Sequence, residues 1–324
     1  MLKINKKIVL SMIPIIFLSL SLTVFTYAWF TNNQSIETTD IEVRARTSKD
    51  IDISTDAINW KSEVTLYDIM NASYTQDRLN QTPKNFQAYS TAGNVNNGLL
   101  DMFHGLVSIN KDPSSENYRK LMFTTEKIRE VDGTSGGFLA FDLYLKNLND
   151  ANLYLGKKSY VNYVTDDSGI DNAVRVAFVF EGTTSLDSDP DSIQAIKSDD
   201  AIVVIWEANS NKHTEAAILN AKNVYGIDIT EDFIDIDYYG VKKEFSTPLL
   251  LTSTDEEYFS KMDNNIRTRS DYSSSTLPNY SLFSLPRGIS KIRIYAWVEG
   301  QDVDCENNAA GSDFKFNFNF TTKK

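Results

Sequence analysis

Asp-Phe-Lys-Phe-Asn-Phe-Asn-Phe-Thr at residues 313–321 alternates aromatic with polar side chains along its whole length. Side chains of a β-strand point to opposite faces in turn, so the four phenylalanines of this segment share one face. A helix would scatter the same rings around its circumference. Burying each ring stabilises a fold by about 1.5–3 kcal/mol. We therefore predict a strand that closes the core, in preference to an exposed aromatic platform that binds sugars.

Similar patterns recur upstream. In residues 289–298, the apolar even-numbered side chains lie opposite Arg293, Tyr295 and Trp297. Residues 174–180 and 201–206 are nearly continuously apolar, which is typical of strands covered on both faces. Strands are therefore expected at 41–45, 51–54, 137–145, 174–180, 201–206, 227–237 and 289–298.

Helices are expected to be short. Glu116–Val131 contains several helix formers, and Thr214–Lys222 begins with a threonine that can cap a helix. The Asn/Ser/Thr-rich stretches 71–98 and 263–281 are expected to be loops. The pattern predicts a mainly β fold, an antiparallel β-sandwich or jelly roll with short helical insertions, preceded by one N-terminal hydrophobic helix. Loop and helical excursions are expected near 66–131 and 212–281.

The N-terminal segment predicts export. Lys3, Lys6 and Lys7 precede the uncharged, apolar stretch Ile8–Phe30, which is typical of an export signal or a signal anchor. Small residues before Trp29 predict cleavage between Ala28 and Trp29. The alternative is a retained anchor, because the apolar stretch is long enough to cross a bilayer. Residues 1–28 are thus a signal peptide or membrane anchor, and residues 29–324 an exported β-sandwich domain, secreted or anchored at the cell surface.

The amino-acid composition argues against several classes of protein. The 324 residues include 44 acidic and 32 basic side chains, a net charge of −12, and 18 Phe, 16 Tyr and 4 Trp. So many aromatic residues exclude a disordered chain. The acidic balance argues against nucleic acid as a partner. Contact with a membrane is expected only through residues 8–30. One cysteine excludes a disulfide framework.

Three segments together resemble a family of exported proteins. Thr26-Tyr-Ala-Trp-Phe-Thr-Asn-Asn33 is similar to the signal peptides of secreted TasA/camelysin-type proteins of Gram-positive bacteria. Ile205-Trp-Glu-Ala-Asn209 with His213, and the segment Ile294–Cys305, look like parts of uncharacterised exported proteins of Clostridia and their wall-less relatives.

This resemblance implies a dedicated signal peptidase and an extracellular jelly-roll or β-sandwich domain. In some members of the family, the domain polymerises into biofilm-matrix fibres by donating a terminal strand to a neighbour. The leader of this chain is longer and contains Pro14.

The sequence contains few histidine and cysteine residues that could act in catalysis. A nucleophilic triad needs a histidine base, and only His104 and His213 exist. Both are expected to be structural or solvated. Cys305 is a lone thiol near Asp302 and Asp304, whose charges disfavour the thiolate. It is expected to be buried or inert, with a bond to a second chain as the alternative.

Calcium is the best metal hypothesis, and no other cofactor is expected. Asp187, Asp189 and Asp191 alternate as carboxylates do in calcium loops. The pattern then breaks at Ser192 and Ser198, which stand where a glycine and a bidentate glutamate are required. The competing interpretation is a solvated acidic loop. Asp302, Asp304 and Glu306 form a second acidic cluster with the same weakness.

These observations predict an extracellular, non-enzymatic surface or biofilm-matrix protein. Its expected partners are further copies of itself, in a fibre or oligomer, or other surface and matrix components. A membrane-anchored binding or adhesion module is the first alternative. A secreted hydrolase that uses paired carboxylates is the second, and it requires a cleft with two neighbouring acids.

Overall fold

The computed structural model describes residues 36–37, 42–47, 51–75, 80–163, 169–229, 236–262, 267–269, 281–305 and 314–323. The expected leader helix, its cleavage position between Ala28 and Trp29, and Glu306 lie outside these residues. Within these ranges, no helix is both long and apolar enough to span a bilayer.

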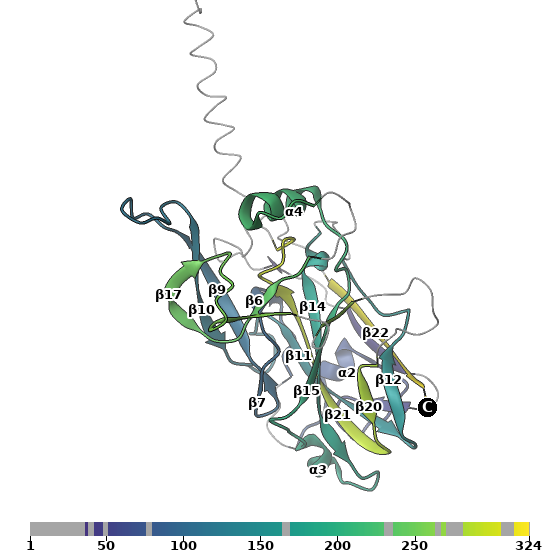
Figure 1. Cartoon of the computed structure of the whole chain (residues 1–324). Coiled ribbons are helices and arrows are strands. Elements are labelled where there is room, and N and C mark those ends of the chain that lie inside the picture. Colours follow the sequence, from purple (N-terminus) through teal and green to yellow (C-terminus); the bar gives the residue numbers. More distant parts are fainter. Residues whose placement is uncertain are drawn as a thin grey trace, which may run out of the picture.

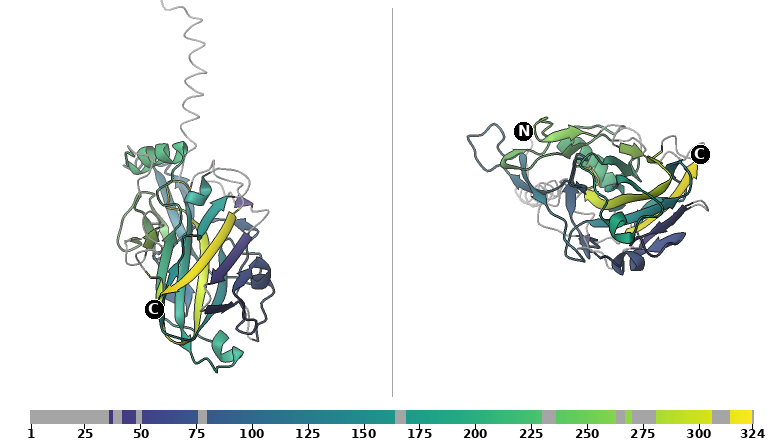
Figure 2. Two further views of the ribbon diagram at one scale, coloured as in Figure 1. Left: turned by 90° about the vertical axis from the view of Figure 1, so that its right-hand side faces the viewer. Right: turned by 90° about the horizontal axis from the view of Figure 1, so that it is seen from below.

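A smaller sheet is built around β22 (Phe314–Lys323), which confirms the strand expected at 313–321. Its strand order is β20-β12-β22-β2-β4, and β13 also pairs with β22. Strand β2 runs parallel to β22, side by side with it in Figure 2, and the other pairings are antiparallel. The other strands of this sheet are β2 (Glu42–Thr47), β4 (Glu63–Thr65), β12 (Ala151–Leu155), β13 (Tyr160–Tyr163) and β20 (Phe283–Leu285).

A larger sheet has β21 (Gly288–Glu299) between β11 (Leu139–Asn147) and β14 (Val174–Thr184). Its main path is β17-β10-β9-β6-β21-β14-β15-β19, and β3 extends it beyond β11. Two of its pairings, β21 with β6 and β15 with β19, are parallel. Its remaining strands are β3 (Ile51–Ser54), β6 (Ala88–Ser90), β9 (Met102–Ile109), β10 (Leu121–Ile128), β15 (Ile202–Glu207), β17 (Phe245–Leu250) and β19 (Arg267–Arg269).

Short elements join and cover the two sheets (Figure 1). The small strand pairs are β1 (Ile36–Glu37) with β5 (Asn85–Phe86), β7 (Val95–Asn96) with β8 (Leu99–Leu100), and β16 (Tyr239–Val241) with β18 (Phe259–Lys261). The helices are α2 (Leu66–Met70), the 3-10 turn η1 (Ile170–Asn172), α3 (Pro190–Gln194), α4 (Glu215–Asn220) and the π-helical turn η2 (Ala221–Tyr225).

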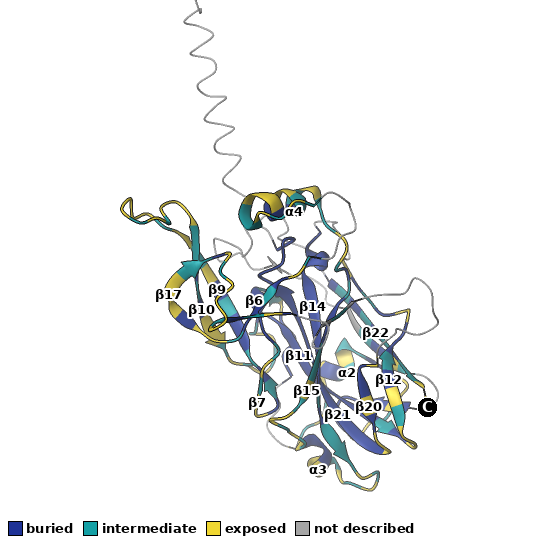
Figure 3. Cartoon of the chain, in the orientation of Figure 1, coloured by how far each residue is buried: buried dark blue, intermediate teal, exposed yellow. Residues whose placement is uncertain are grey.

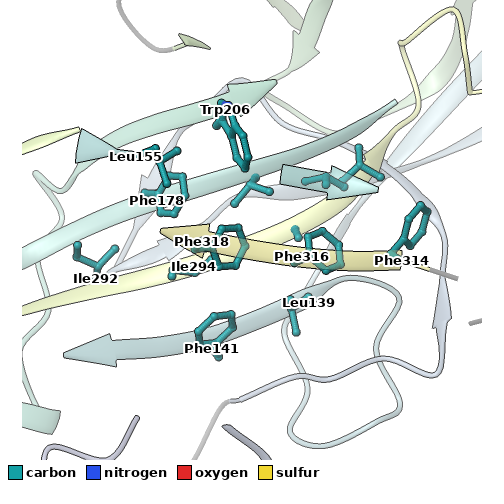
Figure 4. Packing of buried hydrophobic residues seen from close by; sticks show 14 of the residues in the cluster. Leu139, Phe141, Leu155, Phe178, Trp206, Ile292, Ile294, Phe314, Phe316 and Phe318 are labelled. Atoms are coloured by element: carbon teal, nitrogen blue, oxygen red, sulfur yellow. The ribbon is translucent and has the colours of Figure 1, made fainter. Parts of the chain in front are cut away.

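The two sheets pack face to face through the phenylalanine stripe of β22. All four rings of the stripe are buried, and their neighbours across the interface include Phe178 of β14 (Figure 4). The centroid of the Phe178 ring lies 5.8 Å from that of Phe318 and 5.9 Å from that of Phe320, both edge to face. This geometry is the favourable one for aromatic pairs. The predicted core face is therefore confirmed.

The outer face of the larger sheet is also covered. A second apolar cluster joins Tyr89, Met102 and Phe138 to Tyr295 and Trp297 of β21. As a result, every residue of β21 is buried, and the centre of the sheet is dark blue in Figure 3. The alternation seen in residues 289–298 thus separates two buried faces, one apolar and one partly charged.

Several expected strands are confirmed: 41–45, 51–54, 137–145, 174–180, 201–206 and 289–298 correspond to β2, β3, β11, β14, β15 and β21. Strand β15 is covered on both faces only toward its C-terminal end, because Ile202 is 57% exposed. Thr214 caps α4 as expected, since its hydroxyl accepts a hydrogen bond from the backbone N–H of Ala217.

Other expectations were wrong. The helix predicted over Glu116–Val131 is instead strand β10, which pairs with β9 and β17. The strand predicted at 227–237 is absent from its described parts, 227–229 and 236–237. The expected loop 71–98 contains β5, β6 and β7, and β19 lies within 263–281. The sheets are mixed instead of antiparallel, because three pairings are parallel.

Candidate functional site

Strand β21 carries a row of polar and aromatic side chains on the outer face of the larger sheet. Its odd-numbered residues Lys291, Arg293, Tyr295, Trp297 and Glu299 all point away from the phenylalanine stripe, and all are buried. Burying a charge is costly unless an opposite charge and hydrogen bonds compensate. Two charged clusters therefore form, one at each end of the row.

Arg293 organises the first cluster. Its Nη1 atom lies 2.6 Å from Oδ1 of Asp142, the residue directly opposite on β11. Its Nη2 atom contacts the carboxylate of Glu130, to which the hydroxyl of Tyr295 also donates a hydrogen bond. The hydroxyl of Tyr74 donates to Oδ2 of Asp142 at 3.3 Å. Arg293 thus pairs with two acids, Glu130 and Asp142, that both lie far from it in the sequence.

Lys291 extends this cluster toward β14 and α3. Its Nζ atom lies 3.2 Å from Oε2 of Glu181 and 3.5 Å from Oδ2 of Asp142. It also donates to the backbone carbonyls of Gln194 and Ile196, both at 3.1 Å. One ammonium group therefore contacts both acids and holds the end of α3 against the sheet.

Asp142 and Glu181 differ in their protonation. Burial raises the pKa of Asp142, but the positive charges of Arg293 and Lys291 outweigh burial and lower its pKa below the ordinary value. Burial also raises the pKa of Glu181, and Lys291 offsets burial only in part, so its pKa is about 7. The cluster thus holds one firmly ionised acid and one that titrates near neutrality.

A cavity of about 230 Å³ opens above these groups. Its floor is formed by buried charged side chains from the three central strands of the sheet. Its walls come from the β7–β8 turn, from Tyr74 and from the segment after α3. The lining residues are Tyr74, Asn97, Leu99, Asp142, Glu181, Gln194, Ala195, Lys197, Lys291 and Arg293. The carboxylate hydrolase hypothesis required two neighbouring acids in a concave site, and Asp142 and Glu181 are such a pair.

Arg175 organises the second cluster, at the other end of the row. Its Nε atom lies 2.8 Å from Oε1 of Glu207, Nη2 contacts Asp302, and the guanidinium carbon lies 5.0 Å from the centroid of the Tyr238 ring. Nearby, Glu299 accepts one hydrogen bond from Nε1 of Trp297 and one from the backbone N–H of Gln301, both at 3.1 Å. Burial raises the pKa of Glu299 to about 8.

The histidines and the cysteine of the sequence analysis lie apart from the cavity. His104 is on β9, where its Nδ1 atom lies 3.1 Å from the carbonyl oxygen of Ala88. The Nδ1 atom of His213 lies 2.7 Å from Oδ2 of Asp304, at the start of α4. Burial raises the pKa of Asp304 to about 6, although His213 opposes this shift. Cys305 is completely buried and follows the turn that contains Asp302 and Asp304.

The acidic segment proposed to bind calcium, residues 187–191, includes the start of helix α3. Asp189 caps α3, accepting hydrogen bonds from the backbone N–H and the hydroxyl of Ser192. Asp191 lies within α3 and accepts a hydrogen bond from the hydroxyl of Thr75. The described parts of the chain contain no group of three or more His, Cys, Asp or Glu side chains placed to hold a metal ion.

The residues that line the cavity were not predicted as site residues from the sequence. Asp142, Glu181, Lys291 and Arg293 all lie within strands whose apolar residues were recognised. One feature of the sequence could have identified these residues: each is a charged residue within a strand that is otherwise almost continuously apolar. Such a residue is expected to be buried, and a buried charge needs a partner. The identity of the partners comes only from strand register.

Comparisons with family models, with curated proteins and with solved structures found no match for this chain.

Proposed function

We propose that this chain is an exported, non-enzymatic structural protein of the cell surface or its matrix, which works by contact with further copies of itself. The leader and the resemblance of residues 26–33 to TasA/camelysin-type signal peptides support this proposal. The mainly β fold agrees with it. The jelly-roll topology that the resemblance implies, and polymerisation into fibres, belong to the same proposal.

The observation that carries the proposal is an arm, residues 106–118, which consists of the end of β9 and the loop that connects it to β10. This loop projects from the packed sheets (Figure 1). Leu106, Ile109 and Tyr118 of this arm are 46%, 41% and 41% exposed. Leu106 and Ile109 lie on opposite faces of β9, since their positions differ by an odd number. Apolar side chains on both faces of a projecting ribbon favour contact with another protein surface.

Assembly by donation of a strand to a neighbouring copy would require a larger structural change than contact through the arm. Strand β2 already pairs with β22 and β4 of its own chain, and Ala45 at its centre is fully buried. Donating β2 to a neighbour would require these pairings to break first. We therefore place the first contact between copies at the arm, with strand exchange as a later step.

Size-exclusion chromatography with light scattering, and negative-stain microscopy, test this proposal on residues 29–324. We expect association that increases with protein concentration. Leu106→Ser combined with Ile109→Ser should shift the protein to monomer. Leu148→Ser is the matched control, because Leu148 is 61% exposed on the β11–β12 turn, outside the arm. A strict monomer at all concentrations, or equal effects of both variants, would contradict the proposal.

The length of the mature protein distinguishes a secreted protein from a membrane-anchored one. Cleavage between Ala28 and Trp29 removes 28 residues, a loss that intact-mass measurement on protein from native cells detects directly. A full-length mass in the membrane fraction would instead support the anchored adhesion module.

A secreted carboxylate hydrolase is the second candidate, favoured by one observation. Asp142 is held ionised while the pKa of Glu181 is about 7, as expected for a nucleophile and a general acid. Polysaccharide hydrolysis by residues 29–324 that is abolished by both Asp142→Asn and Glu181→Gln would support this function. Activity retained in either variant would refute it.

A further inference from the structure

The cavity runs from an exposed rim to a buried floor. Asn97, Ala195 and Lys197 at the rim are exposed, whereas the acids and cations of the floor are buried. At the rim, the backbone N–H of Asn97 donates a hydrogen bond of 2.5 Å to Oδ1 of Asp199. This bond ties the β7–β8 turn to the segment after α3 at the exposed rim of the cavity.

Glu181 at the floor has fewer partners than its neighbour. Asp142 contacts Arg293 and Lys291 and accepts hydrogen bonds from Tyr74 and Tyr144. Glu181 has a side chain only 1% exposed. Among the described residues, its one cationic contact is Lys291, at a geometry that leaves Oε2 without a hydrogen bond. A buried carboxylate oxygen without a hydrogen bond is costly, and a ligand hydroxyl that donated to Oε2 would reduce that cost.

The turn above Glu181 approaches it closely. Asn97 and Gly98 have positive φ angles of 51° and 77° and connect β7 to β8, as in two-residue hairpin turns. A Cβ atom added at Gly98 would lie 3.3 Å from the carboxyl carbon of Glu181. A larger residue at position 98 would therefore press on the carboxylate of Glu181.

Charges of both signs surround the cavity. Lys197, Lys291 and Arg293 are positive, and Asp142, Glu181, the Glu130 that pairs with Arg293 and the Asp199 at the rim are acidic. Because charges of one sign lie beside charges of the other, the site has little net attraction for a free anion or cation. Leu99 and the Tyr74 ring add apolar walls, which suit the carbon face of a hydroxylated ring.

We propose that this cavity binds a small, neutral, polyhydroxylated molecule the size of one sugar ring, with a hydroxyl group donating a hydrogen bond to Glu181. The site does not depend on the proposed contacts between copies, because its walls and floor come from residues outside the arm. A monomeric protein would still bind the ligand.

This geometry predicts that the affinity for the ligand depends on pH. A donated hydroxyl stabilises the ionised form of Glu181, whose pKa without ligand is about 7. The ionised fraction rises about tenfold between pH 6 and pH 8, so the affinity should rise by about the same factor. Glu181→Gln keeps an accepting oxygen and removes the titration. This variant should therefore bind with little dependence on pH.

Saturation-transfer NMR and calorimetric titration of residues 29–324 test the proposal with D-glucose, D-galactose and N-acetyl-D-glucosamine as probes. We expect at least one of these sugars to bind. Below neutral pH, where the amine of D-glucosamine is a cation, this sugar should bind no more tightly than its neutral counterparts. Glu181→Leu should weaken binding at least tenfold. If none of the three sugars binds, or if the cationic probe binds more tightly, the proposal fails.

A glycine pair provides the matched control. Gly98 and Gly133 have φ angles of 77° and 81°, but a Cβ atom at Gly133 meets nothing within 4 Å. Gly98→Ala and Gly133→Ala should therefore introduce similar backbone strain, while only Gly98→Ala should weaken sugar binding. Near-ultraviolet circular dichroism checks that both variants fold. Equal binding by both folded variants would overturn the assignment of the site to this cavity.

Discussion

Single residues show how strand register, instead of local sequence, sets the chemistry of buried acids. Asp142 lies opposite Arg293 on the neighbouring strand, whereas Glu181 lies at the point where the β14–β21 register shifts. A bulge re-aims a side chain, and Glu181 consequently forms an ion pair with Lys291 alone, where Asp142 pairs with both Lys291 and Arg293. The charged residues were visible in the sequence, but their partners come from segments more than 100 positions away and could not be predicted.

The raised pKa values of Glu181 and Glu299 predict that stability falls with rising pH. Both groups are protonated in the folded chain until about pH 7 and 8, whereas an unfolded glutamate loses its proton above about pH 4.3. Their contribution is therefore fully present below pH 4 and is lost as the pH rises through 7 and 8. We expect the free energy of unfolding to decrease by a few kcal/mol between about pH 5 and 8.

Urea unfolding at a series of pH values measures this decrease. Glu181→Gln combined with Glu299→Gln should flatten the profile, because neither amide titrates. Glu116→Gln is the control, since Glu116 lies exposed in the loop between β9 and β10. A profile that rises over this pH range would show that these two acids are ionised in the folded protein. Equal flattening by the control would show that the pH dependence does not come from them.

Elements differ in how strongly their own residues determine them. Strand β22 was predictable because its period-two alternation is incompatible with a helix. Strand β10 was not, because Leu121–Ile128 contains residues that suit either structure and the flanking residues favour a helix. Its pairings with β9 and β17 decide the outcome, and the ring of Phe123 packs 5.1 Å from that of Phe245. Tertiary partners thus override weak local preference.

The stripe of β22 predicts a contrast between its two faces. Phe316→Ala should destabilise the protein by about 3–5 kcal/mol, because the ring is fully buried between the sheets. Asn317→Ala, on the adjacent position, removes only an exposed hydrogen bond to the carbonyl of Lys158 and should cost less than about 1 kcal/mol. Chemical denaturation of both variants measures the difference. Similar losses would mean that the stripe is not the face that joins the sheets.

At the scale of the whole molecule, one apolar core connects segments from both ends of the chain. The cluster that contains Ala45 and Phe320 also contains Val241, Phe245 and Phe259 from the excursion near 212–281. From the sequence this region was expected to be a loop and helical excursion from the sandwich, because it contains a predicted helix at 214–222 and an Asn/Ser/Thr-rich stretch at 263–281. The structure shows that part of it packs against the main core. A layer that shares buried side chains with the core should unfold together with it.

Differential scanning calorimetry on residues 29–324 tests this cooperativity. We expect a single transition whose calorimetric and van't Hoff enthalpies agree, provided that the protein is kept at concentrations where it is monomeric. Phe259→Ala in the excursion and Phe318→Ala in β22 remove rings of the same size from the same cluster. Each variant should therefore lower the temperature of that one transition. If Phe259→Ala instead produced a separate early transition, with the main one unchanged, the excursion would be an independent unit, and its contacts with the core would contribute little to the stability of the sandwich.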